Sequence, residues 1–436
     1  MEKVYLAMSA DIIHQGHINI IKEATKYGRV IIGLLTDEAI ASYKRIPLLS
    51  YSVRKDIFEE MRDVSEVIPQ KTLDYTENLE KLKPKYVIHG DDWRTGSQKV
   101  IRAKVIETLS QWGGVLVEVP YTKEVSCSSI ERESRYLFNT PDARLAKLRT
   151  ALKLKPFITV CEASNGLSGL IVEESRYTDS ETGLSREFDG MWISSLCDST
   201  FKGKPDTELV DFTSRIRTIE EIMEVTTKPI ILDGDTGGKA EHFAYNVKTL
   251  ERLGVSAIIV EDKTGSKRNS LFGTTVEQTL DDPHEFAAKI ATGKRAQVTR
   301  DFMIFCRIEA LIAGRGVDEA ISRAKIYLEE GKCDGICIHS KDKDGKEIKE
   351  FLQRFREFAK DVPVIVIPTT YNQFRDEELC EWGANIIIYA NHLLRAAYPA
   401  MKNVAECILQ NHRSTEASEK YCISIKEVLS IIPGEK

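Results

Sequence analysis

Short apolar runs alternate with helical patterns along the first third of the chain. The runs occupy residues 4–7, 30–35, 64–69, 86–89 and 115–120. After the second run, the apolar positions Val53, Ile57, Phe58 and Met61 recur at helical spacing. Strand candidates that are separated by helices predict a small parallel sheet with helices on both faces.

From residue 156 the pattern starts again with a longer repeat. Strand-like runs follow at 157–161, 191–196, 229–233, 257–261, 303–307, 335–339, 362–368 and 385–390. Strands and helices in this number and order are typical of a (β/α)8 barrel. Residues 131–155 are charge-rich and show no strand pattern. We therefore expect an α/β chain with a front domain at 1–135, a linker at 136–155, and a barrel with C-terminal helices at 156–436.

The composition is that of a globular protein and narrows the functional classes. The 436 residues are 42% hydrophobic and 29% charged, with a formal net charge of -6. This balance, without a long Lys/Arg run, disfavours nucleic acid as a partner. No apolar run reaches the ~20 residues that span a bilayer. Nine cysteines without zinc-type spacing predict reduced thiols. We expect a cytoplasmic protein with no signal peptide and no membrane partner.

Polar residues stand at the ends of most of the predicted barrel strands. They are Glu162, Ser194, Asp233, Glu261, Arg307 and His339. The active site of a (β/α)8 barrel forms at the carboxyl ends of its strands, where the loops into the helices open. Polar residues of complementary charge at these positions predict one site there.

The motif Asp-Gly-Asp-Thr-Gly-Gly at 233–238 is the sharpest signal at these strand ends. Two carboxylates separated by one glycine, Asp233 and Asp235, suit a hard divalent cation. Glu261 ends the next strand and offers a third oxygen. We therefore expect a metal ion at this rim.

A polar loop at 261–273 follows the metal motif. It carries Lys267 and Asn269 and has the composition of a lid that closes over an anion. Arg307 and His339, on the next two strands, add a planar fork for carboxylate or phosphate and a further donor. This set predicts a small, highly anionic substrate.

Several stretches together resemble one known family. The polar loop reads Glu-Asp-Lys-x-Gly-x-Lys-x-Asn-Ser, and the other matching stretches lie at 165–173, 188–196, 368–371 and 389–399. They resemble the phosphoenolpyruvate mutases of the isocitrate lyase superfamily, over residues 156–433. The resemblance implies conversion of phosphoenolpyruvate to 3-phosphonopyruvate, in which phosphorus leaves oxygen and is recaptured by carbon three of the same pyruvate.

The resemblance also implies roles for individual residues. Asp233 would bind Mg²⁺ directly, with Asp235 and Glu261 in its outer sphere. Asp206 matches the family's acidic residue near the reacting centre. Residues implied to contact or act on the substrate are Trp192, Ser194, Ser195, Arg307 and His339, with Lys267 and Asn269 on the gating loop.

The phosphoryl transfer that the resemblance implies needs positioning and charge stabilisation more than a strong base. Water must also be kept out of the site. Related lyases carry a Lys-Lys-Cys-Gly-His loop with a catalytic cysteine, and the corresponding loop here has no cysteine. Phosphonopyruvate hydrolase shares the metal site but tends to differ at the position of Asn269. The mutase is therefore the expected activity, with the hydrolase as an alternative.

Two histidines stand directly after the first predicted strand. The segment Asp-Ile-Ile-His-Gln-Gly-His at 11–17 precedes a helix predicted at 18–27. His14 and His17 can face one point at the start of this helix, where backbone N–H groups and the helix dipole bind phosphate. The order of strand, loop and helix therefore predicts a phosphate site.

His-x-Gly-His resembles the motif of nucleotidyltransferases with a Rossmann-like sheet. Gly-Asp-Asp-Trp at 90–93 and the serine-rich stretch 126–130 are nearest to the cytidylyltransferase branch. The resemblance implies transfer of CMP from CTP to an oxyanion acceptor, with the two histidines stabilising the transition state. The residues implied to hold the nucleotide are Ser9, Asp11, His14, His17, Lys44, Asp91, Asp92, Ser126 and Ser128.

The front domain departs from the sequence pattern of the cytidylyltransferase branch at a few positions. The opening Gly-Thr-Phe-Asp reads Met-Ser-Ala-Asp at 8–11, and Tyr121 and Glu124 replace an arginine and a glycine of the late loop. The whole chain resembles bifunctional enzymes of phosphonate biosynthesis, which implies 2-hydroxyethylphosphonate or 2-aminoethylphosphonate as acceptor. A mutase with an inert or CTP-sensing front domain is the alternative.

The C-terminal stretch 393–432 is helical in pattern and apolar on one face. By resemblance, this stretch exchanges between barrels, which implies a homodimer or homotetramer.

Overall fold

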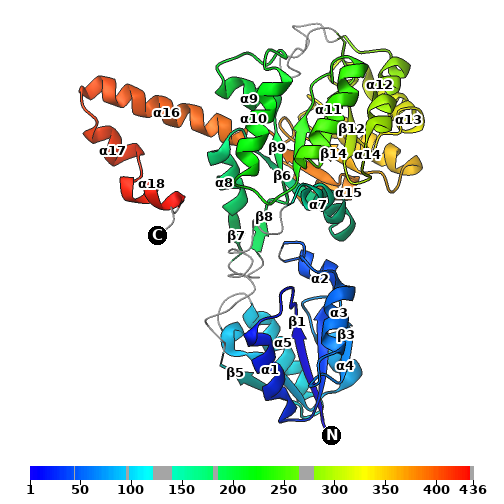
Figure 1. Ribbon diagram of the computed structural model, residues 1–436, viewed down its shortest axis with the longest axis vertical. Coiled ribbons are helices and arrows are strands. Elements are labelled where there is room, and N and C mark those ends of the chain that lie inside the picture. The colour runs from blue at the N-terminus through cyan, green and yellow to red at the C-terminus, as the bar shows by residue number, and fades with distance from the viewer. Residues whose placement is uncertain (44, 95–97, 121–139, 180–184, 265–278, 433–436) are drawn as a thin grey trace.

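The computed structural model describes the chain except residues 44, 95–97, 121–139, 180–184, 265–278 and 433–436. A parallel sheet and a closed barrel follow one another along the chain (Figure 1). The front domain, the barrel and the C-terminal helices can be followed by the colour change from blue to red.

A parallel sheet in the order β3-β2-β1-β4-β5 forms the front domain. Its strands are β1 (Lys3–Met8), β2 (Arg29–Leu35), β3 (Glu66–Gln70), β4 (Tyr86–Gly90) and β5 (Val115–Val119). Its helices are α1 (Gln15–Thr25), α2 (Asp37–Ala41), α3 (Tyr51–Glu59), α4 (Thr76–Leu82), the short 3-10 helix η1 (Asp91–Arg94) and α5 (Lys99–Ser110).

Both faces of this sheet are buried, as the sequence predicted. Along β1, Val4 and Leu6 pack into one core, while Tyr5 and Ala7 pack into the core on the other face. The strand order reverses between β1 and β4, which are hydrogen-bonded neighbours. Ligands of open α/β sheets bind at such a reversal, outside the carboxyl ends of the strands.

The second unit is a closed parallel barrel. Its strands are β6 (Ile158–Glu162), β9 (Gly190–Ile193), β10 (Ile230–Asp233), β11 (Ala257–Glu261), β12 (Met303–Ile308), β13 (Gly335–Ile338), β14 (Val364–Val366) and β15 (Ile386–Tyr389). The helices that follow these strands are α8 (Gly166–Glu174), α9 (Ser195–Phe201), α10 (Phe212–Met223), α11 (Ala240–Leu253), α12 (Pro283–Ala296), α13 (Gly316–Glu329), α14 (Lys346–Phe358) and α15 (Asp376–Trp382). A small antiparallel pair, β7 (Arg176–Thr178) and β8 (Ser185–Glu187), lies between α8 and β9.

Every barrel strand lies where the apolar pattern predicted it, within a few residues at each end. Alternate side chains of each strand point into the barrel or out toward the helices, so two cores form. The inner core includes Val160, Ile231, Phe305 and Ile365, and the outer core fills the space under the helices. The predicted fold class, a Rossmann-like domain followed by a (β/α)8 barrel, is confirmed.

Part of the segment expected as a linker is a helix of the barrel. Helix α7 (Pro141–Leu154) buries Leu145 in the outer core, and it buries Leu148 and Ala151 against the inner core. Its apolar positions are diluted by charged side chains, which is why the sequence pattern alone suggested a linker here.

Helices α16 (His392–Asn411), α17 (Thr415–Tyr421) and α18 (Ile425–Ile431) run away from the barrel (Figure 1). No residue of α16 or α18 is buried, although both helices carry large apolar side chains. Among the described residues, no helix is both long enough and apolar enough to span a bilayer.

Candidate functional site

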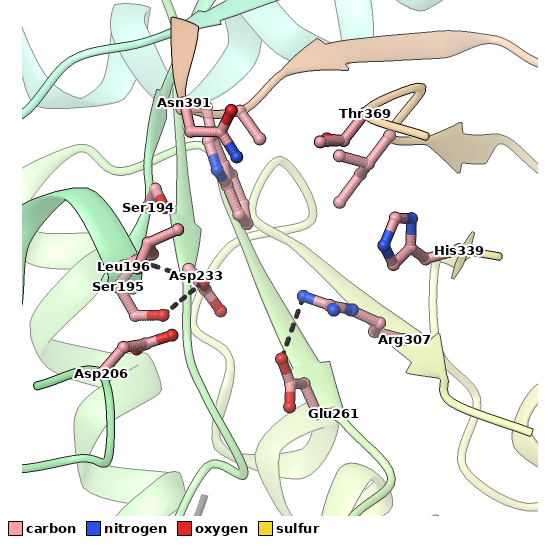
Figure 2. Close-up of a pocket in the computed structure, with 13 residues that line it drawn as sticks. Ser194, Ser195, Leu196, Asp206, Asp233, Glu261, Arg307, His339, Thr369 and Asn391 are labelled. Atoms are coloured by element: carbon pink, nitrogen blue, oxygen red, sulfur yellow. Dashed lines mark hydrogen bonds and ion pairs between the residues drawn. The ribbon is translucent and has the colours of Figure 1, made fainter. Parts of the chain in front are cut away.

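A cavity opens at the carboxyl ends of the barrel strands (Figure 2). The predicted residues that line it are Trp192, Ser194, Ser195, Asp206, Asp233, Glu261, Arg307 and His339. The sequence did not single out the other lining residues, which are Leu196, Ile367, Thr369, Ala390 and Asn391. Thr369 and Asn391 follow β14 and β15, so the rule that identified the other strand ends would have identified them as well.

One of the predicted strand-end residues has a different role. Glu162, at the end of β6, is not among the residues that line the cavity. Its buried carboxylate accepts hydrogen bonds from the Cys197 thiol (3.0 Å) and from the backbone N–H of Leu394 (2.7 Å). Glu162 therefore ties the first turn of α16 to the barrel.

Asp233 receives donors from the start of α9. The backbone N–H and the hydroxyl of Ser195 donate to Asp233 Oδ2 at 3.1 and 2.7 Å (Figure 2). Ser194 caps the same helix by accepting from the N–H of Cys197. The helix N-terminus, which carries partial positive charge, thus faces the carboxylate. In this structure Ser195 therefore binds Asp233 directly, through its backbone N–H and its hydroxyl.

Asp235 does not line the cavity but pairs with Arg215 of α10. Arg215 Nη2 lies 3.1 Å from Asp235 Oδ2, and Nη1 donates to the backbone carbonyl of Asp233. Both side chains are buried, and neighbouring carboxylates, Asp235 first, raise the pKa of Arg215 against the effect of burial. The sequence did not reveal Arg215 because it lies within a helix, outside any motif.

Four buried charged groups occupy the ends of β11 and β12. Glu261 and Arg307 are register partners on these strands, and Arg307 Nη1 lies 2.9 Å from Glu261 Oε1 (Figure 2). Arg307 Nε lies 2.6 Å from Glu309, and Lys263 Nζ lies 3.0 Å from Glu309 and 3.3 Å from Glu261. Burial opposes ionisation of Glu309, but the charges of Arg307 and Lys263 lower its pKa to about 2.

His339 is neutral at physiological pH. Burial, followed by the nearby charge of Arg307, lowers its pKa to about 4. Three buried polar atoms around the cavity have no hydrogen-bond partner within the described part of the chain: His339 Nδ1, Trp192 Nε1 and Asn391 Oδ1. Because buried polar groups in native proteins are nearly always satisfied, these atoms indicate a polar ligand.

Asp206 lies on the loop between α9 and α10. This loop is attached to the Asp-Gly-Asp motif because Glu208 accepts from the backbone N–H of Thr236 at 3.0 Å and from its hydroxyl at 2.8 Å. Asp206 therefore reaches the cavity from the side of Asp233 (Figure 2). Lys267 and Asn269, predicted on the gating loop, lie outside the described residues.

A second constellation lies in the front domain, where the strand order reverses. The N–H of Gly16 donates to His14 Nδ1 at 3.1 Å, and the N–H of His14 donates to His17 Nδ1 at 3.3 Å. Since each Nδ1 accepts, each ring carries a proton on Nε2. The ring centroids are 4.0 Å apart, and partial burial lowers the pKa of His14. Two N–H donors thus lie together at the start of α1.

The other predicted nucleotide residues divide into two groups. Ser9 and Asp11 follow β1, while Asp91 and Asp92 follow the neighbouring strand β4, so both pairs lie at the same edge of the sheet as the histidines. The residue after Asp92, the buried Trp93, stacks on His89 with ring centroids 3.7 Å apart. Lys44, Ser126 and Ser128 lie outside the described residues.

Comparison with known proteins gives two family matches. The model of the phosphoenolpyruvate phosphomutase family matches residues 148–409, and the cytidylyltransferase-like family model matches residues 9–161. The chain is 35% identical over 295 residues to phosphoenolpyruvate phosphomutase from Tetrahymena pyriformis, covering 67% of this chain and 93% of that protein.

Solved structures agree with the phosphoenolpyruvate phosphomutase match. The crystal structure of phosphoenolpyruvate phosphomutase from Streptomyces platensis subsp. rosaceus is similar at 33% identity and a TM-score of 0.59, covering 66% of this chain and 94% of that one. Phosphonopyruvate hydrolase in complex with oxalate and Mg²⁺ is similar at 32% identity and a TM-score of 0.57, with the same coverage. The chain therefore belongs to the phosphoenolpyruvate phosphomutase family and carries a cytidylyltransferase-like domain in front of its barrel.

Proposed function

We propose that the barrel converts phosphoenolpyruvate into 3-phosphonopyruvate. The observation that supports this most directly is the cavity in which Asp233 and Glu261 face Arg307 and His339. In the reaction, the bond between phosphorus and the enol oxygen breaks, and carbon three of the enolate attacks the same phosphorus. Carbon two becomes a carbonyl, so no water or proton is consumed.

The donor set fits Mg²⁺. Within the described residues no group of three or more His, Cys, Asp or Glu side chains is close enough to hold a metal on its own. Mg²⁺ does not require such a group, because it usually binds through one or two carboxylates and keeps several waters. Asp233 would hold the ion directly and Glu261 would act through water, while Asp235, which does not line the cavity, would add negative charge beside Asp233. When bound, Mg²⁺ supplies positive charge to the enolate oxygen.

The remaining side chains of the cavity bind and orient the substrate. Arg307, which Glu261 and Glu309 hold in place, presents its guanidinium to the carboxylate or phosphoryl group. His339 acts as a neutral hydrogen-bonding group, while Trp192 and Ser194 line the opposite side of the cavity. Asp206 would act near the reacting centre, and Lys267 and Asn269, which lie outside the described residues, would act as groups of the gating loop.

Exclusion of water separates the mutase from a hydrolase. In both reactions the bond that holds the phosphoryl group in the substrate breaks. The product then depends on whether water or the pyruvate enolate captures that group. Asn269 favours the mutase, whereas similarity to a phosphonopyruvate hydrolase makes hydrolysis to pyruvate and phosphate the second candidate.

The mutase is tested by phosphorus NMR of the purified chain with Mg²⁺ and phosphonopyruvate. We expect phosphoenolpyruvate to form, and Asp233→Ala to lower the rate by roughly 10²-fold or more, because it removes the main charge that holds the metal. Asp318→Ala, which changes a surface carboxylate paired with Arg354, should react at the wild-type rate. Free phosphate in place of phosphoenolpyruvate would identify a hydrolase instead.

The neutral state of His339 is tested by an NMR titration of [13C-ε1]histidine-labelled protein. A pKa of about 4 means that the His339 signal, assigned with His339→Gln, should not move between pH 8 and about pH 5.5. His284 serves as the control, because its hydrogen bond with Glu330 and the charge of that residue raise its pKa. Its signal should titrate above pH 6.5. A shift of the His339 signal with a midpoint near 6.5 would exclude the neutral role.

We propose that the front domain transfers CMP from CTP to a phosphonate, such as 2-hydroxyethylphosphonate or 2-aminoethylphosphonate. The two adjacent Nε2–H groups of His14 and His17 support this, because they offer donors to an α-phosphate in a pentacoordinate transition state. Ser9, Asp11, Asp91 and Asp92 would complete the nucleotide site, together with Lys44, Ser126 and Ser128. An inert or CTP-sensing domain is the alternative.

Pyrophosphate release from CTP in the presence of each phosphonate tests this transfer. His14→Ala and His17→Ala should each lower the rate by roughly 10²-fold, since each removes one donor to the transition state. His242→Ala, on the exposed side of α11, should leave it unchanged. If CTP alone changes the mutase rate while no pyrophosphate appears, the front domain is a sensor.

We propose further that two copies of the chain associate through the C-terminal helices. Exposed apolar side chains line these helices, and large exposed apolar patches mark interfaces. They include Tyr398, Met401, Ile408, Leu409, Ile423, Ile425, Val428, Leu429 and Ile432.

Light scattering coupled to size exclusion tests the association. The wild-type chain should elute as a dimer or tetramer, and Leu409→Glu combined with Leu429→Glu should shift it to the monomer, because charges at a buried interface are costly. Val298→Glu, another exposed apolar position outside these helices, should keep the assembly. A wild-type monomer at micromolar concentration would contradict the proposal.

A further inference from the structure

Arg45 of the front domain is bound by the barrel through its whole guanidinium group. Nε donates to Glu187 Oε2 at 2.8 Å, and Nη2 donates to the backbone carbonyl of Glu173 at 2.9 Å. Nη1 donates to Glu173 Oε1 at 2.7 Å and to Thr227 Oγ1 at 3.1 Å. The acceptors come from three separate barrel segments: the end of α8, the end of β8 and the loop before β10.

The barrel presents these acceptors as a built site. The Glu173 side chain is 1% exposed, and it also accepts from the hydroxyls of Thr226 and Thr227. Burial opposes ionisation of Glu187, but the charges of Arg45 and Lys228 lower its pKa to about 2. The buried Glu173 and the half-buried Glu187, both fixed by barrel residues, therefore receive a cation from the other domain.

This site lies at the amino-terminal end of the barrel, away from the cavity described above. Thr227 comes just before β10, whereas Asp233 ends that strand. Next to Arg45, Ile46 packs against the inner core where Leu148 and Ala151 of α7 close the barrel. In Figure 1 the front domain faces this end of the barrel, beside α7 and β8.

The other end of the same short segment is held by the candidate nucleotide site. The backbone N–H groups of Leu48 and Leu49 donate to the two carboxylate oxygens of Asp11 at 2.8 and 2.9 Å. Asp11 is 5% exposed and precedes His14 by three residues. The fully buried Arg54 donates to the carbonyls of Leu49 (3.0 Å) and Ser9 (2.6 Å), which ties the segment to the turn after β1.

Only a few residues separate the two attachments. A fully extended chain reaches at most about 3.5 Å per residue, so the two attachments lie close together and little chain is left between them in which a shift of Arg45 on the barrel could relax before it reaches Asp11. The segment 45–49 thus joins the barrel to the loop that carries His14 and His17.

We propose that the segment 45–49 is an interdomain clamp and that Arg45 is a positioning residue for the nucleotide site. This inference rests on the proposed nucleotidyl transfer by the front domain. Docking of Arg45 on the barrel holds the Asp11 loop in the geometry that binds CTP. By linkage, CTP binding in turn strengthens docking. The mutase cavity, at the opposite end of the barrel, is not part of this coupling.

The test compares the full-length wild type with Arg45→Ala, Arg45→Lys and, as a matched control, Arg29→Ala. Arg29 forms an exposed ion pair with Glu66 inside the front domain and does not reach the barrel. If the docked fraction in Arg45→Ala falls to about a tenth, the KM for CTP rises about tenfold. Arg45→Lys should give an intermediate value, because an ammonium group cannot serve all four acceptors. Arg29→Ala and the mutase rate of every variant should match the wild type.

Hydrogen exchange of the Leu48 and Leu49 amides supplies a readout that does not depend on turnover. These amides should exchange faster in Arg45→Ala, and added CTP should slow them in the wild type. Glu187→Gln is the matching change on the barrel side. It should also raise the KM for CTP, and it should add little to Arg45→Ala, since both remove the same contact. If Arg45→Ala does not fold, the KM for CTP and the amide exchange of Glu187→Gln alone test the proposal.

The outcomes separate this inference from the function on which it rests. A wild type that neither binds CTP nor releases pyrophosphate overturns the proposed transfer, and the clamp's role falls with it. A wild type that turns over CTP, with unchanged KM and unchanged amide exchange in Arg45→Ala and Glu187→Gln, overturns the clamp alone. A raised KM in both variants with an intact mutase rate supports it.

Discussion

Four buried charges at the ends of two adjacent barrel strands organise the candidate mutase site. Glu261, Lys263, Arg307 and Glu309 carry no net charge together, and their ion pairs measure 2.6 to 3.3 Å. Burying an ion costs several kcal/mol unless partners replace its water. Displacing any one of the four would leave another uncompensated, so the set is held as a unit. The guanidinium of Arg307 is therefore already oriented before an anion arrives.

The carboxylate side of the cavity is held in place by a comparable set of contacts. Asp233 is fixed by Ser195 at the start of α9, and Arg215 binds both its backbone and the side chain of Asp235. Glu208 connects the loop of Asp206 to the same motif. These contacts offset the repulsion among the carboxylates. They also fix the positions of the carboxylates at this rim of the barrel.

The two ends of the barrel serve different purposes. The carboxyl ends of the strands carry the candidate active-site cavity, at the position where (β/α)8 barrels carry their active sites. At the amino ends, Glu173 and Glu187 bind a residue of the front domain. The candidate nucleotide site lies on the front domain and the candidate mutase cavity on the barrel, with no shared side chain among those described.

The strands could be predicted from the amino-acid sequence because apolar runs report burial directly. The candidate site residues at the strand ends could be predicted because parallel strands present their carboxyl ends at one rim. The pattern also indicated His14 and His17, whose spacing is local. The packing of the folded chain was needed to show that Glu162 holds α16, that Asp235 faces Arg215 instead of the cavity, and that Arg45 binds the barrel. Each of these side chains pairs with a residue distant in sequence, up to 232 positions away. A pattern read along the chain cannot specify such partners, because they meet only when the barrel closes and the two domains pack.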